Sequence, residues 1–447
     1  MALMISVSGI RGIFGEDLNP ENLARFTAAY GTWIGRRKVV VGRDSRVTGE
    51  LCEKIVAATL QSTGCDVILA GIVPTPTVAM EVLRHGAGGG IILSASHNPA
   101  EWNALKLLND KSEFLDADQG EQVIQIADKG KRLYVGYDQI GSVSTSDDAV
   151  KDHVDRILAL PYIDADQIAA ANFSVAVDAV NGAGSESFPY LLERLGIRRI
   201  EKIHCTPNGL FPHNPEPLPE HLGDICNLVK EKSCDIGFVT DPDGDRLAVV
   251  DNNGRFIGEE YTQAAAFDFL LGKKPGPIVT NLSSSMVNDD IAKKFRQVCH
   301  RSAVGEINVV KQMQKVGAVL GGEGNGGVIN PDLHPGRDGL VGIAMILQHL
   351  AELGITSSEY RDSLPDYTIV KRKMQLKDLD ADSVLKHLLK RYGNGDTDTT
   401  DGLKIRFEDG WAHLRKSNTE PIIRLYTEAT TRDHAESIAD EIQNQIS

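Results

Sequence analysis

The stretch DIGFVTDPDGDR, residues 235–246, joins a run of apolar residues to three aspartates at alternate positions. The apolar run predicts a buried strand. Asp241, Asp243 and Asp245 then lie at its carboxyl end, where open α/β sheets place their ligands. Carboxylates that converge to about 4 Å repel by roughly 4 kcal/mol per pair at an effective dielectric of about 20. The pattern therefore predicts that a cation binds at this loop.

A hard divalent cation such as Mg²⁺ or Ca²⁺ suits the loop, because these ions take oxygen ligands. An EF-hand is excluded, since its sixth and twelfth positions require Gly and Glu, and this loop has Arg246 and Asn252 there. A solvated turn rich in Asp, Pro and Gly remains the alternative explanation.

Composition limits the classes of function. The 447 residues are 41% hydrophobic and 24% charged, which predicts a globular chain of about three or four domains. The formal net charge of −15 disfavours nucleic acid and anionic membranes as partners. The start of the chain has no signal-peptide pattern, and no apolar run is long enough for a membrane span. The six cysteines form no C-x-x-C pair and no zinc spacing. These features predict a cytoplasmic protein with buried thiols.

Short apolar runs that end in glycine-rich or polar loops alternate with helical patterns over most of the chain. This alternation predicts parallel or mixed α/β sheets, and its recurrence predicts three similar units. Asn19 and Pro20 predict a helix start. The last eighty or so residues differ, because GLKIRFEDGWAHLRKS alternates apolar and polar residues around Asp409-Gly410, which predicts a hairpin in a small α+β domain. Residues 141–150 and 362–367 are predicted linkers.

The stretch ILSASHNPAEWNALK, residues 92–106, carries Ser94, Ser96, His97 and Lys106. Adjacent Ser and His are not expected to form a catalytic pair, because neighbouring side chains usually diverge. A Ser, Asn and Pro turn is the alternative to a functional loop. A serine can instead carry a phosphoryl group, whose oxygen would be a further ligand for the cation.

Four further stretches contain groups that suit a sugar phosphate. SGIRG and VGRDSR supply Arg11, Arg43 and Arg46 beside glycines. GGEGNGG, residues 321–327, carries a carboxylate and an amide that suit sugar hydroxyls. A flexible loop without a function is the alternative. The stretch is not a Walker A motif. A turn-forming run at residues 415–424 combines hydroxyl, backbone N–H and guanidinium groups that suit a phosphate. Its candidate residues are Arg415, Ser417, Asn418, Thr419 and Arg424. A surface turn without a function is the alternative.

With these stretches in this order, the whole chain resembles the α-D-phosphohexomutase superfamily. That superfamily has a phosphoserine motif ending in Ser-His-Asn-Pro, a metal loop Asp-x-Asp-x-Asp-Arg, a sugar loop Gly-Glu-x-Ser-Gly and a phosphate loop Arg-x-Ser-Gly/Asn-Thr-Glu/Thr-Pro. Four motifs in the correct order make the resemblance specific.

The resemblance implies a role for each matching residue. Ser96 would be the phosphoserine, and Asp241, Asp243 and Asp245 would hold Mg²⁺ together with a phosphoserine oxygen. Lys106 and Arg11 would lie near the transferring phosphoryl group, and His97 matches an active-site histidine. Glu323 and Asn325 would bind the sugar, and Arg246 would line the same cleft. The phosphate that is not reacting would be held by Arg415, Ser417, Asn418 and Thr419, with Arg424 beside them.

The resemblance also implies an architecture. Three related α/β domains, residues 1–150, 151–256 and 257–364, would precede a C-terminal α+β domain of the TATA-binding-protein-like fold, residues 365–447. Together they would form a heart shape around a central cleft. The chain would be a monomer or a homodimer.

The implied reaction interconverts a hexose 6-phosphate and a hexose 1-phosphate through phosphoserine and a hexose 1,6-bisphosphate. The substrate is less closely specified, because Asn325 replaces the usual Ser, Gly327 stands where many members have His, and Glu306 stands where some phosphomannomutase/phosphoglucomutase members have a second His. General likeness favours a phosphoglucosamine mutase. A phosphomannomutase/phosphoglucomutase of dual specificity is the alternative, and a serine-dependent phosphatase or an idle sugar-phosphate sensor is less favoured.

Overall fold

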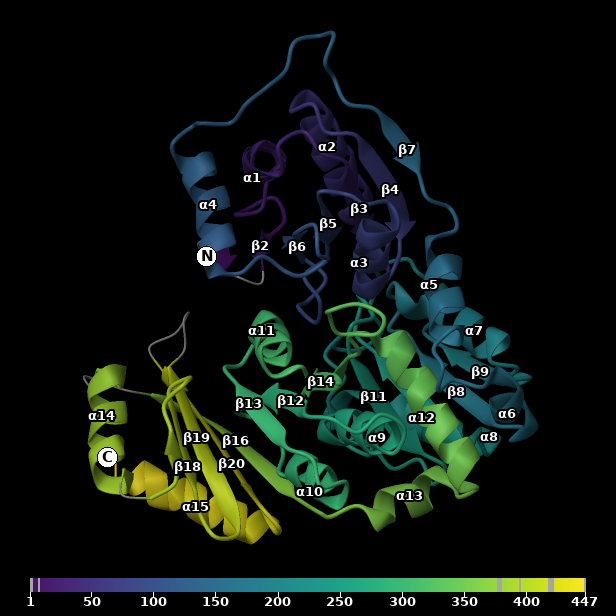
Figure 1. Cartoon of the computed structure of the whole chain (residues 1–447), viewed down its shortest axis with the longest axis vertical. Coiled ribbons are helices and arrows are strands. Elements are labelled where there is room, and N and C mark those ends of the chain that lie inside the picture. The colour runs from purple at the N-terminus through teal and green to yellow at the C-terminus, as the bar shows by residue number, and fades with distance from the viewer. Residues whose placement is uncertain (1–2, 7–8, 376–379, 394, 417–421, 446–447) are drawn as a thin grey trace. The chain divides into compact units, whose positions relative to one another are not determined.

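The computed structural model describes residues 3–6, 9–375, 380–393, 395–416 and 422–445. The chain forms two compact units (Figure 1). Unit one comprises Met1–Leu270 and Asn325–Arg361, and unit two comprises Leu271–Gly324 and Asp362–Ser447.

The first sheet of unit one consists, in spatial order, of β1 (Met4–Ser6), β2 (Gly9–Ile13), β6 (Trp102–Leu108), β5 (Gly89–Leu93), β3 (Val39–Arg43), β4 (Val67–Ile72) and β7 (Val143–Thr145). The accompanying helices are α1 (Pro20–Ile34), α2 (Gly49–Ser62), α3 (Thr75–Arg84) and α4 (Ala117–Asp128). Val39 and Val41 pack with residues of α1, α2 and α4, whereas Val40 packs with α3. Successive residues of a strand point to opposite faces, so helices cover both sides of this sheet.

The start of α1 confirms the predicted helix signal. Asn19 is extended, its side chain accepts a hydrogen bond from Asn22 N, and Pro20 occupies the first turn. The side-chain oxygen thereby satisfies one of the backbone N–H groups that a helix start leaves unpaired.

The second sheet of unit one has the order β11 (Leu247–Asp251), β10 (Ile236–Thr240), β8 (Ser174–Asp178) and β9 (Arg199–Ile203). β10 is parallel to β8 and antiparallel to β11, with Thr240 opposite Leu247. The aspartate loop at residues 241–246 is therefore the connection of a hairpin. The helices that follow in this unit are α5 (Ala149–Leu158), α6 (Ala165–Ala170), α7 (Gly184–Arg194), η1 (Pro219–His221) and α8 (Gly223–Lys232).

Unit one also contains the segment that follows the glycine-rich loop. This segment forms β15 (Gly327–Ile329), α12 (Gly339–Leu353) and most of α13 (Ser357–Ser363), and α9 (Glu259–Leu271) lies almost wholly in the same unit. No single helix in the described part of the chain is long and apolar enough to cross a membrane, although α12 and α13, bent by 88°, pass that test as a pair.

Unit two contains a parallel arrangement of β12 (Ile278–Asn281) with β13 (Cys299–Ser302) and β14 (Leu320–Glu323), accompanied by α10 (Val287–Lys294) and α11 (Glu306–Val316). Its antiparallel sheet has the order β16 (Thr368–Gln375), β20 (Ile422–Ala429), β19 (Gly410–Lys416), β18 (Leu403–Arg406) and β17 (Thr397–Asp398). Helices α14 (Ala381–Tyr392) and α15 (Arg432–Asn444) share one apolar core with this sheet. The predicted α/β and C-terminal α+β classes, and the hairpin before β19, are confirmed.

Two predictions need correction. Residues 141–150 are not a linker, because β7 pairs with β4 and α5 already begins at Ala149. The thiols are also less uniformly buried than predicted. All six are free, but Cys205, Cys226 and Cys299 are only partly buried.

Candidate active site

The aspartate loop begins where β10 ends, and every residue of that strand is buried. Gly244 adopts a left-handed φ of 69°, which glycine tolerates without strain. The Thr240 hydroxyl donates to the Arg246 carbonyl at 2.9 Å and closes the loop. The carboxylates of Asp241, Asp243 and Asp245 are all 0% exposed. The tight hairpin thus holds three carboxylates together in a site without solvent access.

These carboxylates offer free oxygens to a cation. One oxygen from each lies within 4.8 Å of those of the other two. Asp243 Oδ1 and Asp245 Oδ1 are buried and have no hydrogen-bond partner in the part of the chain that the structure describes. Buried polar atoms are normally bonded, and an orphaned pair of carboxylate oxygens is what a hard cation would satisfy. The residues therefore fit a divalent metal ion.

Ser96 contacts this loop directly. Its hydroxyl donates to Asp241 Oδ2 at 2.6 Å. Burial, and then the charges of Asp245 and Asp243, raise the pKa of Asp241 well above its ordinary value. The predicted phosphoserine and the predicted metal ligands, which are about 150 residues apart in sequence, are therefore brought together.

A strained backbone presents Ser96. Its φ is 50°, a left-handed value that is unusual for a residue with a side chain. Its N–H donates to Ser94 Oγ at 2.9 Å, and Ser94 Oγ in turn donates to Asp44 Oδ2 at 2.7 Å. The surrounding hydrogen bonds hold the strained conformation, as is common at functional sites.

Arg46 supports the backbone of the Ser96 loop. Its side chain is fully buried and pairs with Asp44 at 3.0 Å. Its guanidinium group also donates to four backbone carbonyls at 2.5–3.0 Å: Ser96, Asn98, Pro99 and Trp102. The sequence grouped Arg43 and Arg46 with phosphate-binding residues. The structure corrects this, because Arg46 binds backbone and Arg43 pairs with Glu53 on α2 at 3.2 Å.

The side chains of His97 and Ser96 were predicted to diverge, but they lie close together. The distance from His97 Nδ1 to Ser96 Oγ is 3.3 Å, and Ser96 has the left-handed φ of 50°. Arg246 NH2 lies 2.9 Å from the same nitrogen. Burial, and then the charges of Arg246 and Arg11, lower the pKa of His97 to about 2. The imidazole is therefore neutral at physiological pH and accepts a hydrogen bond at Nδ1.

Lys106 pairs with Asp243 and lies close to Asp245. Lys106 Nζ lies 2.5 Å from Asp243 Oδ2 and 3.9 Å from Asp245 Oδ2. Thr75 Oγ1, at the start of α3, donates to the same Asp243 oxygen at 2.6 Å. Burial acts to raise the pKa of Asp243, but Lys106 and the hydrogen bond from Thr75 together hold the pKa below its ordinary value. Arg11 on β2 donates to Asn98 Oδ1 at 2.5 Å, beside the Ser96 loop.

Arg337 is the cation that pairs with Asp245, and the sequence did not identify it. Its NH2 lies 2.7 Å from Asp245 Oδ2. A Cβ at Gly327 would overlap Arg337 Cδ, so the side chain of Arg337 occupies the space that a larger residue at Gly327 would need. Glycine at position 327 thus leaves room for the side chain of Arg337, ten residues later.

Asn325 has a local role in unit one. Its Oδ1 accepts a hydrogen bond from Gly327 N at 3.3 Å and closes the glycine-rich turn. Gly326 O also accepts from Leu247 N at 3.0 Å, which ties this turn to β11.

Glu323 belongs to unit two, at the end of β14. Its Oε1 accepts hydrogen bonds from Asn281 Nδ2 at 3.1 Å and from Gly305 N at 3.0 Å. Gly305 has a φ of 118° and immediately precedes Glu306, the first residue of α11. Glu306, which also carries a carboxylate, is therefore the next residue after Gly305, whose N–H bonds the predicted sugar-binding Glu323.

The predicted phosphate-binding arginines also lie in unit two. Arg415 on β19 is directly opposite Arg424 on β20. Arg415 Nε lies 2.7 Å from Asp401 Oδ2, which also accepts from Val304 N at 2.9 Å. Two like charges on facing strands repel unless an anion lies near them. Ser417, Asn418 and Thr419 lie outside the described residues.

Comparison with known proteins decides the family. Four family descriptions, "Phosphoglucomutase/phosphomannomutase, alpha/beta/alpha domain" I, II and III and "C-terminal domain", match residues 3–134, 151–254, 258–367 and 369–445 in turn. The chain belongs to the phosphoglucomutase/phosphomannomutase family. It is a phosphohexomutase, as the four sequence motifs predicted.

Individual relatives of this phosphohexomutase cover nearly the whole chain. A "Phosphoglucomutase/phosphomannomutase" of Thermococcus kodakarensis is 37% identical over 97% of this chain and 96% of its own. A "Probable phosphoglucosamine mutase" of Methanopyrus kandleri is 34% identical over 99% and 97%. The crystal structure of a phosphoglucomutase/phosphomannomutase family protein from Burkholderia thailandensis superposes with a TM-score of 0.85 at 26% identity, covering 99% of this chain and 98% of that one.

Proposed function

We propose that this phosphohexomutase interconverts glucosamine 6-phosphate and glucosamine 1-phosphate by way of phospho-Ser96 and a 1,6-bisphosphate. The observation that carries the proposal is the 2.6 Å contact of Ser96 Oγ with Asp241, beside two unbonded carboxylate oxygens. A nucleophilic oxygen held against a cation site is the arrangement that phosphoryl transfer requires.

The proposed cycle leaves the enzyme unchanged. The phosphoryl group leaves Ser96 Oγ for the free sugar hydroxyl, which loses a proton as Ser96 regains one. The bisphosphate then reverses in the site, and its other phosphoryl group returns to Ser96. Lys106, Arg246 and Arg11 are the proposed charge partners of the transferring group, because all three lie around the Ser96 loop.

Asp241, Asp243 and Asp245 are the proposed ligands of Mg²⁺, with an oxygen of phospho-Ser96 completing the set. Bound Mg²⁺ would neutralise charge on the transferring phosphoryl group. Lys106 and Thr75 both bond Asp243 Oδ2, which leaves Asp243 Oδ1 available as a ligand. In the same way, Arg337 bonds Asp245 Oδ2 and leaves Oδ1.

In unit two we propose that Glu323 binds the sugar hydroxyls and that Arg415 and Arg424 bind the phosphate that is not reacting. Gly305 N donates a hydrogen bond to Glu323, and the adjacent Val304 N donates one to Asp401. Asp401 in turn pairs with Arg415, and this link supports a common role. The acidic net charge supports an enzyme without nucleic-acid or membrane partners. The cytoplasmic location stays a prediction from the cysteine pattern. The four domain boundaries and the monomeric or dimeric state stay predictions.

Glu306 supports an amino sugar as the substrate. Glucosamine carries an ammonium group that glucose and mannose lack, and Glu306 adds a second carboxylate next to the Glu323 site. Dual specificity for glucose and mannose phosphates is the second candidate, because the relative that is 37% identical is named "Phosphoglucomutase/phosphomannomutase". Steady-state rates on glucosamine, glucose and mannose 6-phosphates, with 1,6-bisphosphate present, test the proposal. A preference for another sugar phosphate would overturn the proposal that glucosamine phosphate is the substrate. Net release of inorganic phosphate would overturn the proposal of a mutase reaction.

Glu306→Gln is expected to lower kcat/KM for glucosamine 6-phosphate by roughly five- to tenfold, because an opposite charge at a partly hydrated site contributes about 1 kcal/mol. The value for glucose 6-phosphate should change little. The ratio of the two is the measurement, and Glu408→Gln, in an exposed turn of the same unit, is the control. An unchanged ratio would assign the selection of the amino group to other residues.

Arg337→Met is expected to reduce turnover by roughly ten- to hundredfold, the equivalent of one charge-assisted hydrogen bond of about 1.5–3 kcal/mol. The loss should be accompanied by weaker Mg²⁺ activation, because Asp245 loses the cation that orients it, and Arg337→Lys should recover part of it. Arg255→Met removes an ion pair with Asp251 elsewhere in unit one and is the control. Normal Mg²⁺ activation of Arg337→Met would contradict the positioning role.

A further inference from the structure

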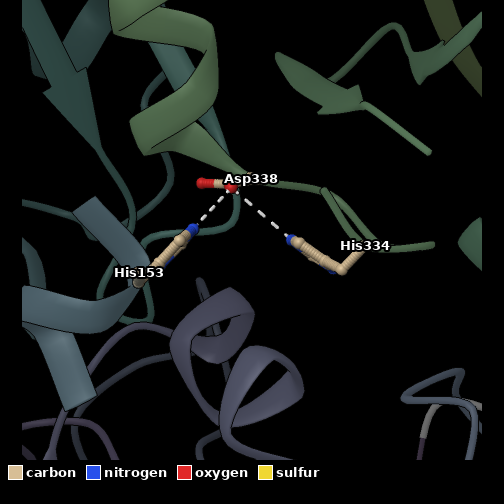
Figure 2. Close-up of side chains that lie close together, drawn as sticks. All are labelled: His153, His334 and Asp338. Carbon is tan, nitrogen blue, oxygen red and sulfur yellow. Dashed lines mark hydrogen bonds and ion pairs between the residues drawn. The ribbon is translucent and has the colours of Figure 1, made fainter. Parts of the chain in front are cut away.

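Three buried side chains that take no part in the proposed reaction converge in unit one. His153 comes from α5, His334 from the loop before α12, and Asp338 is the residue that caps α12. They are 0%, 2% and 1% exposed, respectively. Figure 2 shows a ring nitrogen of each histidine directed at the carboxylate of Asp338 from a different side.

The spacing of their ligand atoms is that of a metal site. His153 Nε2 lies 3.0 Å and His334 Nε2 lies 3.5 Å from the same oxygen, Asp338 Oδ2. The three atoms lie within 4.8 Å of one another. Ligands at the corners of a tetrahedron with bonds of about 2.1 Å are about 3.4 Å apart. The group needs little adjustment to enclose an ion.

Outer contacts fix two of the three side chains in a ligating orientation. His153 Nδ1 lies 3.0 Å from Thr77 Oγ1, which leaves Nε2 to face the carboxylate. Asp338 Oδ1 accepts from Leu340 N at 2.8 Å and from Val341 N at 3.3 Å, which leaves Oδ2 to face the histidines. Metal-binding histidines and carboxylates are held by such outer contacts.

His334 is the group that the protein alone does not satisfy. Neither of its ring nitrogens has a hydrogen-bond partner in the described ranges of the chain, and the 3.5 Å approach to Asp338 is too long for a good one. A buried polar atom without a partner calls for a missing ligand. A cation between Nε2 and Asp338 Oδ2 would satisfy both.

We propose that His153, His334 and Asp338 bind one divalent transition-metal ion of the Zn²⁺ type, with water in the remaining position. Two imidazoles and one carboxylate suit Zn²⁺, whereas Mg²⁺ prefers oxygen ligands alone, so this site and the aspartate triad have different preferences. The ion would cross-link α5 to the start of α12. It would also fix the backbone of Arg337, the neighbour of Asp338 that bonds Asp245.

A second cluster provides a matched control. Asp178 Oδ2 lies 3.0 Å from His204 Nδ1 and 3.1 Å from His213 Nε2. Here His213 Nδ1 is hydrogen bonded to the Asn214 carbonyl at 2.8 Å, and both histidines are partly exposed. This cluster is satisfied by the protein, so it is not expected to take up the ion.

The test titrates metal-stripped full-length protein with Co²⁺ and then with Zn²⁺. One equivalent of Co²⁺ should give the intense visible absorption of a tetrahedral site, Zn²⁺ should abolish it, and Zn²⁺ should raise the thermal midpoint. Asp243→Asn should keep the signal, which separates it from the aspartate triad, and His213→Gln should keep it as well. The readouts need no catalytic turnover, so the outcome is independent of the proposed reaction.

His334→Gln and His153→Gln should each lose the absorption and the Zn²⁺-dependent shift. Both variants keep a polar side chain of similar length, and their circular dichroism and metal-free thermal midpoints show whether they are folded. Absence of stoichiometric Co²⁺ binding to the wild type overturns the proposal. Retention of the signal in folded His334→Gln, or its loss in His213→Gln, overturns the assignment to these residues.

Discussion

Ser96→Ala is expected to reduce mutase turnover by at least about a thousandfold, because removal of an enzymatic nucleophile leaves only binding and electrostatic contributions. The Ser96 hydroxyl is the group that contacts Asp241, and alanine cannot carry a phosphoryl group. The measurement is the rate of hexose 1-phosphate formation with added 1,6-bisphosphate. Intact-mass analysis should find one phosphoryl group on the wild type, with peptide mapping to Ser96, and none on the variant.

Ser112→Ala is the matched control. Ser112 is also a buried serine with a left-handed backbone, at φ 61°, and its hydroxyl has no hydrogen-bond partner among the described residues. Its substitution should therefore leave turnover and phosphorylation unchanged. Near-normal turnover of Ser96→Ala, or a phosphoryl group mapped to Ser94, would refute the assignment of Ser96.

The aspartate loop was predictable because its signals are local. An apolar strand, alternate carboxylates and a glycine lie within twelve residues, and β10 with its loop follows that order. Contact between Ser96 and Asp241 was not derivable from spacing. It depends on two sheets meeting within unit one. The chemistry of a phosphoserine oxygen as a metal ligand suggested the contact, and the family resemblance assigned it to Ser96.

Arg46 and Arg337 show why other parts of the site were missed or misread. An arginine beside glycine suggests a phosphate ligand, but Arg46 is enclosed by the loop that it supports and its donors are used by carbonyls. Arg337 follows the glycine-rich loop by ten residues, and its relation to Gly327 appears only when the chain turns back on itself. Such roles depend on which neighbours bury a side chain, and sequence patterns do not contain that information.

Asp243→Asn is expected to lower Mg²⁺-dependent turnover by roughly 10²- to 10³-fold, comparable to loss of a major electrostatic contact to the transition state. Lys106 Nζ and Thr75 Oγ1 both donate to Asp243 Oδ2. The amide oxygen of an asparagine must therefore occupy that place, because an NH₂ group would meet two donors. The NH₂ group then replaces Asp243 Oδ1 and points at the cation site. A donor cannot ligate a metal ion.

The decisive measurement is metal binding rather than rate alone. Mg²⁺ should raise the thermal midpoint of the wild type and should not raise that of Asp243→Asn. Asp251→Asn is the control, because Asp251 is equally buried on the neighbouring strand β11 but bonds Arg255 and backbone N–H groups. That variant should lose folding stability and keep its response to Mg²⁺. Full activity of the wild type in excess chelator, or an undiminished Mg²⁺ response in Asp243→Asn, would show that the three carboxylates do not hold the ion on which turnover depends.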